Sequence, residues 1–180
     1  TLFNTNGGLF NIFYSPDEHI IYKIPKNLAA YKLLADQEFY AYQYYLTTPL
    51  KKFLIPNVSY NKKTAILKHH FIRGKTGEDI LFSNTSLTVD QMQSLKCFHD
   101  TYKGLNSPLK LDIHPGNFVW SETKQMWYFI DTGVIPQIGS EYYDYPTFKD
   151  YFINIWQKRE ENMKNIPIRS LDYCVNLDII

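Results

Sequence analysis

Two short segments carry the residues that could do chemistry. Lys110-Leu111-Asp112-Ile113-His114-Pro115-Gly116-Asn117 places an aspartate five positions before an asparagine, and Ile130-Asp131-Thr132-Gly133 adds a second aspartate before a glycine. This layout is typical of a phosphoryl-transfer site. The Asp112 carboxylate would accept or orient the proton of an attacking hydroxyl. Asn117 and Asp131 would hold the Mg²⁺ ions that bridge nucleotide phosphates.

The segment between these motifs is predicted to be a β-hairpin. Residues 118–120 and 126–130 are apolar runs, and five polar residues separate them. Such a hairpin brings Asn117 and Asp131 to one edge. His114 is a second candidate base because its ring can titrate near neutrality, so the choice between Asp112 and His114 stays open.

The N-terminal stretch could cover phosphates. In Asn6-Gly7-Gly8-Leu9-Phe10-Asn11 the glycines permit a tight hairpin, and asparagine tolerates positive φ better than most residues. An ordinary Asn-Gly hairpin is the alternative. Residues 12–14 and 19–24 then predict two strands joined by a turn at residues 15–18, with Lys23 near the end of its strand.

A helix is predicted from an Asn27 N-cap to about residue 46. Its expected buried stripe has three- and four-residue spacing: Leu28, Tyr31, Ala35, Phe39, Tyr42 and Leu46. Glu38 would lie about 60° from the centre of that stripe, from where it could reach Lys23. A surface glutamate is the alternative.

The remaining elements follow from similar patterns. Residues 51–57 and 64–71 predict two more strands, which complete a five-stranded antiparallel sheet. A Thr88-x-x-Gln91 capping box predicts a helix ending near Gly104, and residues 147–163 predict another. The apolar residues expected on the buried sides of these two helices are Met92, Leu95, Phe98, His99 and Tyr102, then Phe148, Tyr151, Phe152, Ile155, Trp156 and Met163. Gly74-Lys75-Thr76 lacks the earlier glycine of a P-loop and is not interpreted as one.

With these motifs the chain resembles the protein-kinase-like superfamily. Asp112-x-x-x-x-Asn117 and Asp131-x-Gly stand where that family has its catalytic aspartate, metal-binding asparagine and Asp-Phe-Gly. The resemblance implies ATP and Mg²⁺ as cofactors. It also implies roles for further residues: Gly7, Gly8 and Phe10 over the phosphates, Lys23 on the phosphates with Glu38 as its partner, and the backbone of His70 and Ile72 at the adenine.

The departures from the family are informative. Lys110-Leu111 replaces His-Arg, so the arginine that docks a phosphorylated activation loop is missing. Thr132 replaces the phenylalanine whose packing switches the family between states. Both changes imply an enzyme that acts without being switched on. The His114-Pro115-Gly116-Asn117 ending also resembles small-molecule phosphotransferases such as aminoglycoside and choline kinases.

The predicted fold class is α+β. We expect one two-lobed minimal kinase domain, with an N-lobe over about residues 1–72 and a truncated, mostly helical C-lobe over about 73–180. The expected reaction transfers the ATP γ-phosphate to a protein Ser/Thr hydroxyl. A small-molecule kinase and a pseudokinase are the alternatives. The short tail resembles minimal effector kinases that bacterial pathogens inject into host cells, including the family that phosphorylates the heat-shock protein 90 chaperone.

The composition indicates which classes of partner and which cellular compartment to expect. The chain has 19 basic and 18 acidic residues and only isolated lysine pairs, which argues against nucleic-acid binding. Its two cysteines share no metal or redox spacing, which is typical of a reduced, cytoplasmic setting, and for an effector that setting would be the host cytoplasm. No apolar run is long enough to predict a membrane span. We expect a monomer with its core built largely from the 15 Tyr and 12 Phe.

Overall fold

A computed structural model describes residues 2–3, 9–83, 86–133 and 144–162 of the chain, with side chains from residue 9 to residue 154. Its N-terminal half is an antiparallel sheet in the order β1-β2-β3-β5-β4, and a separate hairpin follows later in the chain. The sheet strands are β1 (Leu2–Phe3), β2 (Phe10–Ser15), β3 (Ile20–Pro25), β4 (Ser59–Asn61) and β5 (Ile66–His70), and the hairpin strands are β6 (Phe118–Ser121) and β7 (Met126–Phe129).

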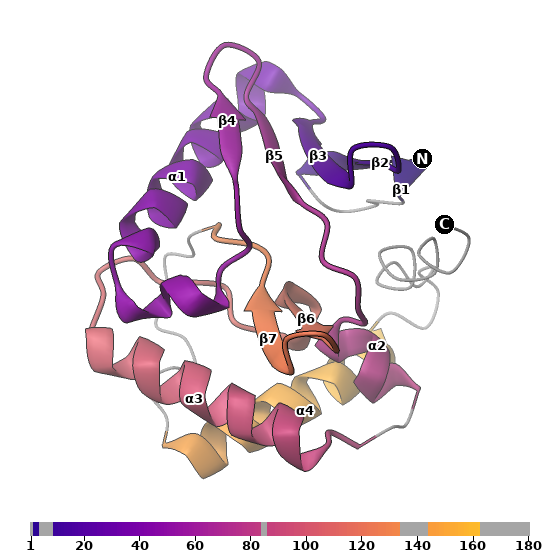
Figure 1. Cartoon of the computed structure of the whole chain (residues 1–180), viewed down its shortest axis with the longest axis vertical. Helices are drawn as coiled ribbons and strands as arrows, with labels where there is room; N and C mark the ends of the chain where they lie inside the picture. The colour runs from indigo at the N-terminus through magenta and orange to yellow at the C-terminus, as the bar shows by residue number, and fades with distance from the viewer. Residues whose placement is uncertain (1, 4–8, 84–85, 134–143, 163–180) are drawn as a thin grey trace.

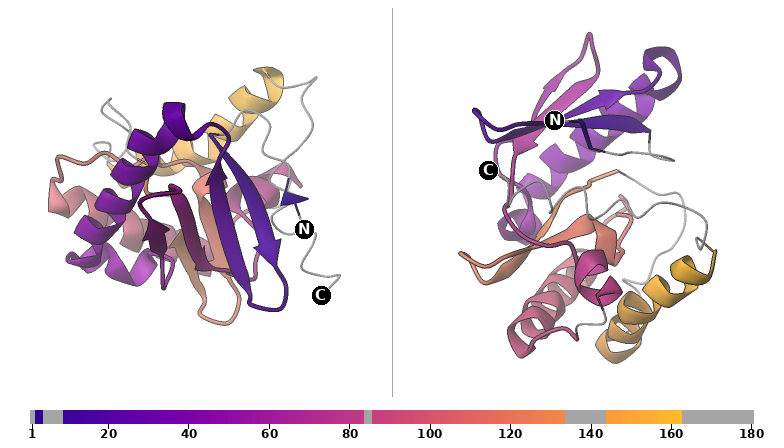
Figure 2. Two further views of the ribbon diagram at one scale, coloured as in Figure 1. Left: turned by 90° about the horizontal axis from the view of Figure 1, so that it is seen from above. Right: turned by 90° about the vertical axis from the view of Figure 1, so that its right-hand side faces the viewer.

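Helices cover the sheet and build the other half. Helix α1 packs against β3 and β5, while α2, α3 and α4 lie on the far side of the β6–β7 hairpin (Figure 1). Seen from the side, the sheet with α1 and the three later helices form two parts, with the hairpin between them (Figure 2). The helices are α1 (Leu28–Leu46), α2 (Gly77–Phe82), α3 (Val89–Leu105) and α4 (Tyr145–Asn162), with short 3-10 helices η1 (Pro49–Phe53) and η2 (Pro115–Asn117).

The α1 helix begins as predicted but buries a different stripe. The Asn27 side chain accepts a hydrogen bond from the Ala30 N–H at 2.8 Å and caps the helix. Its buried residues are Ala35, Glu38, Ala41, Tyr42 and Tyr45. Leu28 is 46% exposed, so its predicted burial is wrong. Most of the first two turns of α1 is solvent-exposed, and burial starts where the helix crosses the sheet, which moves Glu38 into the buried line.

The predicted strand at residues 51–57 is wrong, because this segment starts inside the helix η1. The Thr48 hydroxyl accepts the Leu50 N–H at 3.2 Å, and Pro49 has a φ suited to a first helical turn. Leu50 and Phe53 lie one turn apart and are both buried in the main core. The sheet strand comes later, at Ser59–Asn61.

Helix α2 was not predicted, although its sequence signal is present. Thr76 and Asp79 form a capping box, in which each side chain accepts a backbone N–H of the other. Just before it the chain passes the backbone of β6 closely, since a Cβ on Gly74 would lie 1.9 Å from the Trp120 carbonyl oxygen. Gly74 therefore permits a chain crossing and belongs to no P-loop.

Helices α3 and α4 agree with prediction in most details. The Thr88–Gln91 capping box is confirmed. The last residue of α3 is Leu105, one past the predicted end at Gly104, and Asn106 caps the helix in the left-handed conformation with φ 46°. On α4 Phe148 and Phe152 are fully buried as predicted. Tyr151 is 40% exposed, so its predicted burial is wrong. The side chains of Ile155, Trp156 and Met163 lie outside the described residues.

One large core joins the two parts. It is rich in aromatic rings, with Phe98 packed edge-on against both Phe53 and Phe118. Tyr42 and Tyr45 of α1 belong to the same cluster, so α1 is anchored in the helical part. Leu111 is fully buried there. In the part of the chain that the structure describes, no helix has the length and apolar character needed to cross a membrane.

We predict that Leu111→Arg lowers the free energy of unfolding by about 3 kcal/mol or more, because it buries a charge without a partner. Leu33→Arg is the matched control, since Leu33 is 66% exposed on α1; there we expect a change within about 0.5 kcal/mol. Urea unfolding midpoints measure both. Equal midpoints would contradict the packing of Leu111.

Candidate active site

The site is organised around the buried side chain of Lys23. Lys23 lies on β3 opposite Ile12 of β2 and Leu67 of β5. Its ammonium group donates a short hydrogen bond to the Glu38 carboxylate, and both side chains are less than 10% exposed. The Phe10 ring lies 5.0 Å from Lys23 Nζ and shields the pair from one side.

The second carboxylate at this ammonium group is Asp131. Its Oδ1 lies 3.9 Å from Lys23 Nζ and accepts the Gly133 N–H at 2.8 Å. The Asp131 side chain is 41% exposed, so it can still reach a ligand. Three segments that are far apart in sequence, β3, α1 and the loop after β7, therefore meet at one positive charge.

The pKa values of these groups follow from burial and mutual charge. Burial raises the pKa of Glu38 to about 7, with Lys23 opposing the shift. Burial tends to lower the pKa of Lys23, but Asp131 and Glu38 outweigh it and the net shift is upward. Burial tends to raise the pKa of Asp131, but the charge of Lys23 outweighs it and the net shift is downward. Lys23 thus stays charged and Asp131 stays a carboxylate at neutral pH.

Asn117 connects the loop of Asp112 to the strand that leads to Asp131. Its Nδ2 donates to the Asp112 carbonyl oxygen at 2.7 Å, and its own carbonyl accepts the Ile130 N–H at 2.9 Å. Asn117 is 9% exposed, whereas the Asp112 carboxylate is 51% exposed. The hairpin thus brings Asn117 beside the residue preceding Asp131, as the sequence predicted.

His114 lies beside Asp112 with a defined ring orientation. Its Nδ1 accepts the Gly116 N–H at 3.1 Å, so in the neutral ring the proton is on Nε2. That Nε2 lies 3.5 Å from Asp112 Oδ2. The histidine therefore presents an N–H, not a free lone pair, to the carboxylate.

Thr132 makes a contact that sequence reasoning missed. Its hydroxyl, 6% exposed as a residue, donates to the Glu38 carbonyl oxygen at 2.9 Å. The loop after β7 is thereby tied to the turn of α1 that carries the partner of Lys23. The sequence shows that Thr132 replaces the phenylalanine of the family's Asp-Phe-Gly motif. It does not show which backbone group the threonine hydroxyl will contact, because that group lies on a distant segment.

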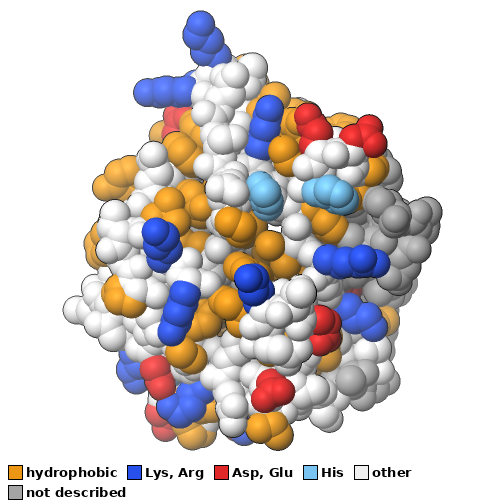
Figure 3. Space-filling view, viewed as in Figure 1, with side chains coloured by type: hydrophobic (Ala, Val, Ile, Leu, Met, Phe, Trp, Pro, Cys, Tyr) orange, Lys and Arg blue, Asp and Glu red, His pale blue; other side chains and the backbone are white. Residues whose placement is uncertain are grey.

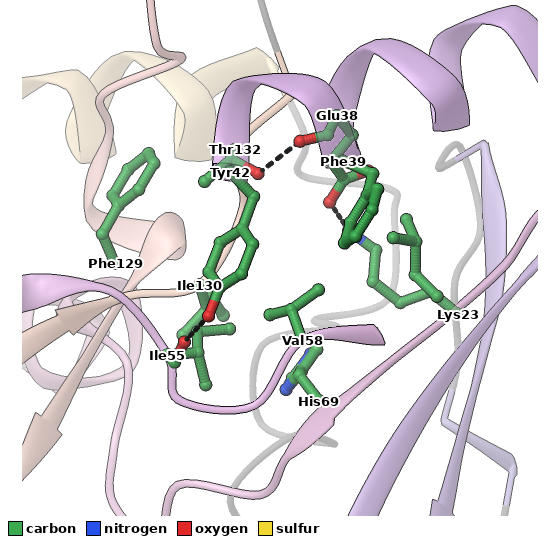
Figure 4. A pocket seen from close by; sticks show the side chains of 11 residues that line it. Lys23, Glu38, Phe39, Tyr42, Ile55, Val58, His69, Phe129, Ile130 and Thr132 are labelled. Carbon is green, nitrogen blue, oxygen red and sulfur yellow. Dashed lines mark hydrogen bonds and ion pairs between the residues drawn. The ribbon is translucent and has the colours of Figure 1, made fainter. Parts of the chain in front are cut away.

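A small pocket lies behind Lys23, between the sheet, α1 and the end of β7 (Figure 4). Its polar lining comes from Lys23, Glu38, His69 and Thr132, and its apolar lining from Phe39, Tyr42, Ile55, Val58, Leu67, Phe129 and Ile130. His69 is the other residue that the sequence did not single out as a site residue. Its inward orientation follows from the alternation of β5, in which Leu67 and His69 are buried while Lys68 and His70 are exposed.

The other predicted binding residues stand as follows. Phe10 is buried beside Lys23. Gly7 and Gly8 lie outside the described residues. His70 is exposed, with Nε2 3.1 Å from Asn57 Nδ2, and Ile72 is half-buried; that their backbone binds the adenine stays a prediction.

The metal-binding prediction depends on Asn117 and Asp131 alone. Among the described residues no group of three or more His, Cys, Asp or Glu could enclose an ion. An amide oxygen and a carboxylate instead fit Mg²⁺, which takes few protein ligands and completes its shell with phosphate and water oxygens.

We predict that Thr132→Val lowers the free energy of unfolding by about 1 kcal/mol, because the buried hydroxyl that ties the loop after β7 to α1 is lost. Thr132→Ser keeps that hydroxyl and should be as stable as the parent. Urea unfolding at 25 °C measures the free energy of each variant. If the serine and valine variants behave alike, the hydrogen bond has no such role.

We also predict a pH effect on stability from His69, whose pKa burial lowers from 6.5 to about 4. Between these pH values the unfolded chain binds the proton and the folded chain does not. Stability should therefore fall with falling pH by at most about 1.4 kcal/mol per unit. Comparing the slope of unfolding free energy against pH for the parent and His69→Phe isolates the effect. Identical slopes would show that His69 titrates normally in the folded protein.

Comparison with known proteins gives the fold. No protein-family model and no curated protein matches the chain. The crystal structure of WbdD aligns with 99% of this chain and 45% of its own, at 15% identity and TM-score 0.56. A second structure, of the bifunctional kinase-methyltransferase WbdD, aligns with 96% of this chain and 48% of its own, at 12% identity and TM-score 0.48. The Mycobacterium tuberculosis PknI kinase domain aligns with 76% of this chain and 59% of its own, at 10% identity and TM-score 0.43. The chain spans less than half the length of WbdD. It has a protein-kinase-like fold.

Proposed function

We propose that this protein is an ATP-dependent phosphotransferase. The supporting observation is the convergence at Lys23, where one buried ammonium group contacts Glu38 and lies 3.9 Å from Asp131. A structural ion pair needs one carboxylate. The second, partly exposed carboxylate leaves a positive and a negative group together at a pocket, which suits phosphates and their metal ion.

Each residue then has a role. Lys23, held by Glu38, would bind the phosphates, and Asn117 with Asp131 would bind Mg²⁺, whose charge stabilises the transferred phosphoryl group. Asp112 would accept the proton of the acceptor hydroxyl, for which its exposed carboxylate is suited. His114 would orient Asp112 through Nε2–H and would not itself serve as the base, because its other ring nitrogen is occupied by Gly116.

For the acceptor we propose a protein Ser/Thr hydroxyl. This choice follows the resemblance of the Asp112-x-x-x-x-Asn117 and Asp131-x-Gly motifs to those of protein kinases. A bacterial effector that acts on the heat-shock protein 90 chaperone in a host cytoplasm, as a monomer, remains a prediction from the sequence resemblance alone.

A small-molecule kinase is the second candidate, favoured by His114-Pro115 in the loop. Incubation with labelled ATP and a cell lysate distinguishes the two. We expect label in protein, on phosphoserine or phosphothreonine. Label confined to small metabolites would reverse the choice of acceptor.

We predict that Asp112→Ala lowers the transfer rate at least about 100-fold while the affinity for Mg-ATP changes little. Asp131→Ala should lose both transfer and Mg-ATP affinity, because Asp131 would bind the metal ion. Asp100→Ala is the control, since Asp100 is an exposed α3 residue paired with Lys96. Single-turnover transfer and calorimetry measure the two properties.

Two outcomes would count against these roles. Full activity of Asp112→Ala would exclude it as the base. Absence of Mg-ATP binding by the parent, seen as no increase in melting temperature, would favour a pseudokinase or an unrelated binding module.

A further inference from the structure

The segment that leads into Asp112 is held by two buried tyrosines that no catalytic role above uses. After α3 the chain turns back and passes the end of α1 before it reaches the Asp112 loop (Figure 1). Residues 107–111 on this path belong to no helix and to no strand of either sheet. Tyr45 of α1 is fully buried and Tyr102 of α3 is 2% exposed, and the hydroxyl groups of both rings contact this segment.

Tyr102 fixes the backbone just before Asp112. The Leu111 N–H donates to the Tyr102 hydroxyl at 2.8 Å. On the other side of this position, Asn117 Nδ2 donates to the Asp112 carbonyl oxygen at 2.7 Å. The chain is therefore held one residue before Asp112 and again at Asp112 itself, so the origin of the Asp112 side chain is fixed from both directions.

Tyr45 holds the same segment from the side of α1. Its hydroxyl donates a hydrogen bond to the Leu109 carbonyl oxygen and lies 2.9 Å from the Ser107 hydroxyl. The Ser107 hydroxyl in turn accepts the Leu109 N–H at 3.0 Å. Both backbone polar groups of Leu109 thus bind side chains, as buried irregular chain requires in the absence of helix or sheet partners. The Tyr45 and Tyr102 rings pack edge to face with their centroids 6.0 Å apart.

Helix α1 thereby connects the two halves of the proposed site. Tyr45 follows Glu38 by about two helical turns, so both side chains project from one face of α1, roughly 10 Å apart along its axis. Glu38 contacts Lys23, whereas Tyr45 contacts the segment before Asp112. The separation between the phosphate-binding lysine and the base is therefore set through one rigid element.

We propose that the hydroxyl groups of Tyr45 and Tyr102 position Asp112 for phosphoryl transfer by holding residues 107–111. This inference depends on the proposed function, since Asp112 is a base only in that reaction. The base must lie within hydrogen-bond reach of the acceptor hydroxyl, and a displacement of about 1 Å can slow a reaction about 100-fold. Both tyrosines are positioning residues, because they act through Asp112.

The test replaces each tyrosine with phenylalanine, which keeps the buried ring and removes the hydroxyl. In single turnover, Tyr45→Phe and Tyr102→Phe should consume γ-labelled Mg-ATP at least about tenfold more slowly than the parent. The measurement counts label released to water and label on protein together, so it requires no identified acceptor. The calorimetric affinity for Mg-ATP should stay within about twofold of the parent's, because no phosphate or metal contact is removed.

Tyr145→Phe is the matched control. The Tyr145 hydroxyl also donates to a backbone carbonyl oxygen, that of Met92 at 2.9 Å, but this bond joins α4 to α3 and does not involve the Asp112 loop. We expect this variant to consume Mg-ATP at the parent's rate.

A second measurement separates positioning from a general loss of structure. In an Asp112→Ala background the carboxylate to be positioned is already gone, so adding Tyr102→Phe should slow the residual reaction by less than about twofold. A tyrosine that supports only the overall fold would slow the reaction by the same factor with and without Asp112.

The remaining outcomes contradict the proposal. Parent rates in both phenylalanine variants, an equal loss in Tyr145→Phe, or the same factor lost in the Asp112→Ala background would overturn the role of the tyrosines and leave the proposed function intact. If Tyr102→Phe fails to fold, Tyr45→Phe gives the same readouts. A parent that does not bind Mg-ATP would overturn the proposed function and this inference together.

Discussion

The structure depends on one buried charge. Taking the Lys23 ammonium group out of water is unfavourable by several kcal/mol unless carboxylates surround it. Glu38 supplies the direct contact, and Asp131 supplies a second negative charge 3.9 Å away. Because these residues come from β3, α1 and the loop after β7, the ion pair forms only when the sheet, the helix and the hairpin are in place. The stability of the fold and the geometry of the site are therefore coupled.

The surrounding hydrogen bonds set where the two carboxylates lie. Thr132 ties the Asp131 loop to the carbonyl of Glu38, and Asn117 joins the Asp112 loop to the end of β7. On the face drawn in Figure 3, acidic and basic side chains are dispersed among hydrophobic ones. Lys23 and Glu38 are buried between the sheet and α1, while the Asp131 carboxylate beside them stays partly exposed.

The departures from the kinase pattern acquire a physical meaning in this arrangement. Leu111 stands where the family has an arginine, and it is fully buried in the main core, so it serves packing. Thr132 stands where the family has a phenylalanine, and its hydroxyl bonds to α1 directly. Both residues therefore make buried contacts that hold their loops in place. That the protein acts without a phosphorylation switch stays a prediction from the sequence.

The sequence by itself determined the local elements and the pattern of the site. Caps at Asn27 and Thr88 and the apolar runs around residues 118–130 act within one or two turns of chain, so they could be read directly. Packing decided the rest. It exposed Leu28 and moved Glu38 fully inward. It also turned His69 into the pocket behind Lys23 and the Thr132 hydroxyl toward the Glu38 carbonyl. These outcomes depend on which distant surfaces meet, and residue spacing along one segment carries no information about that.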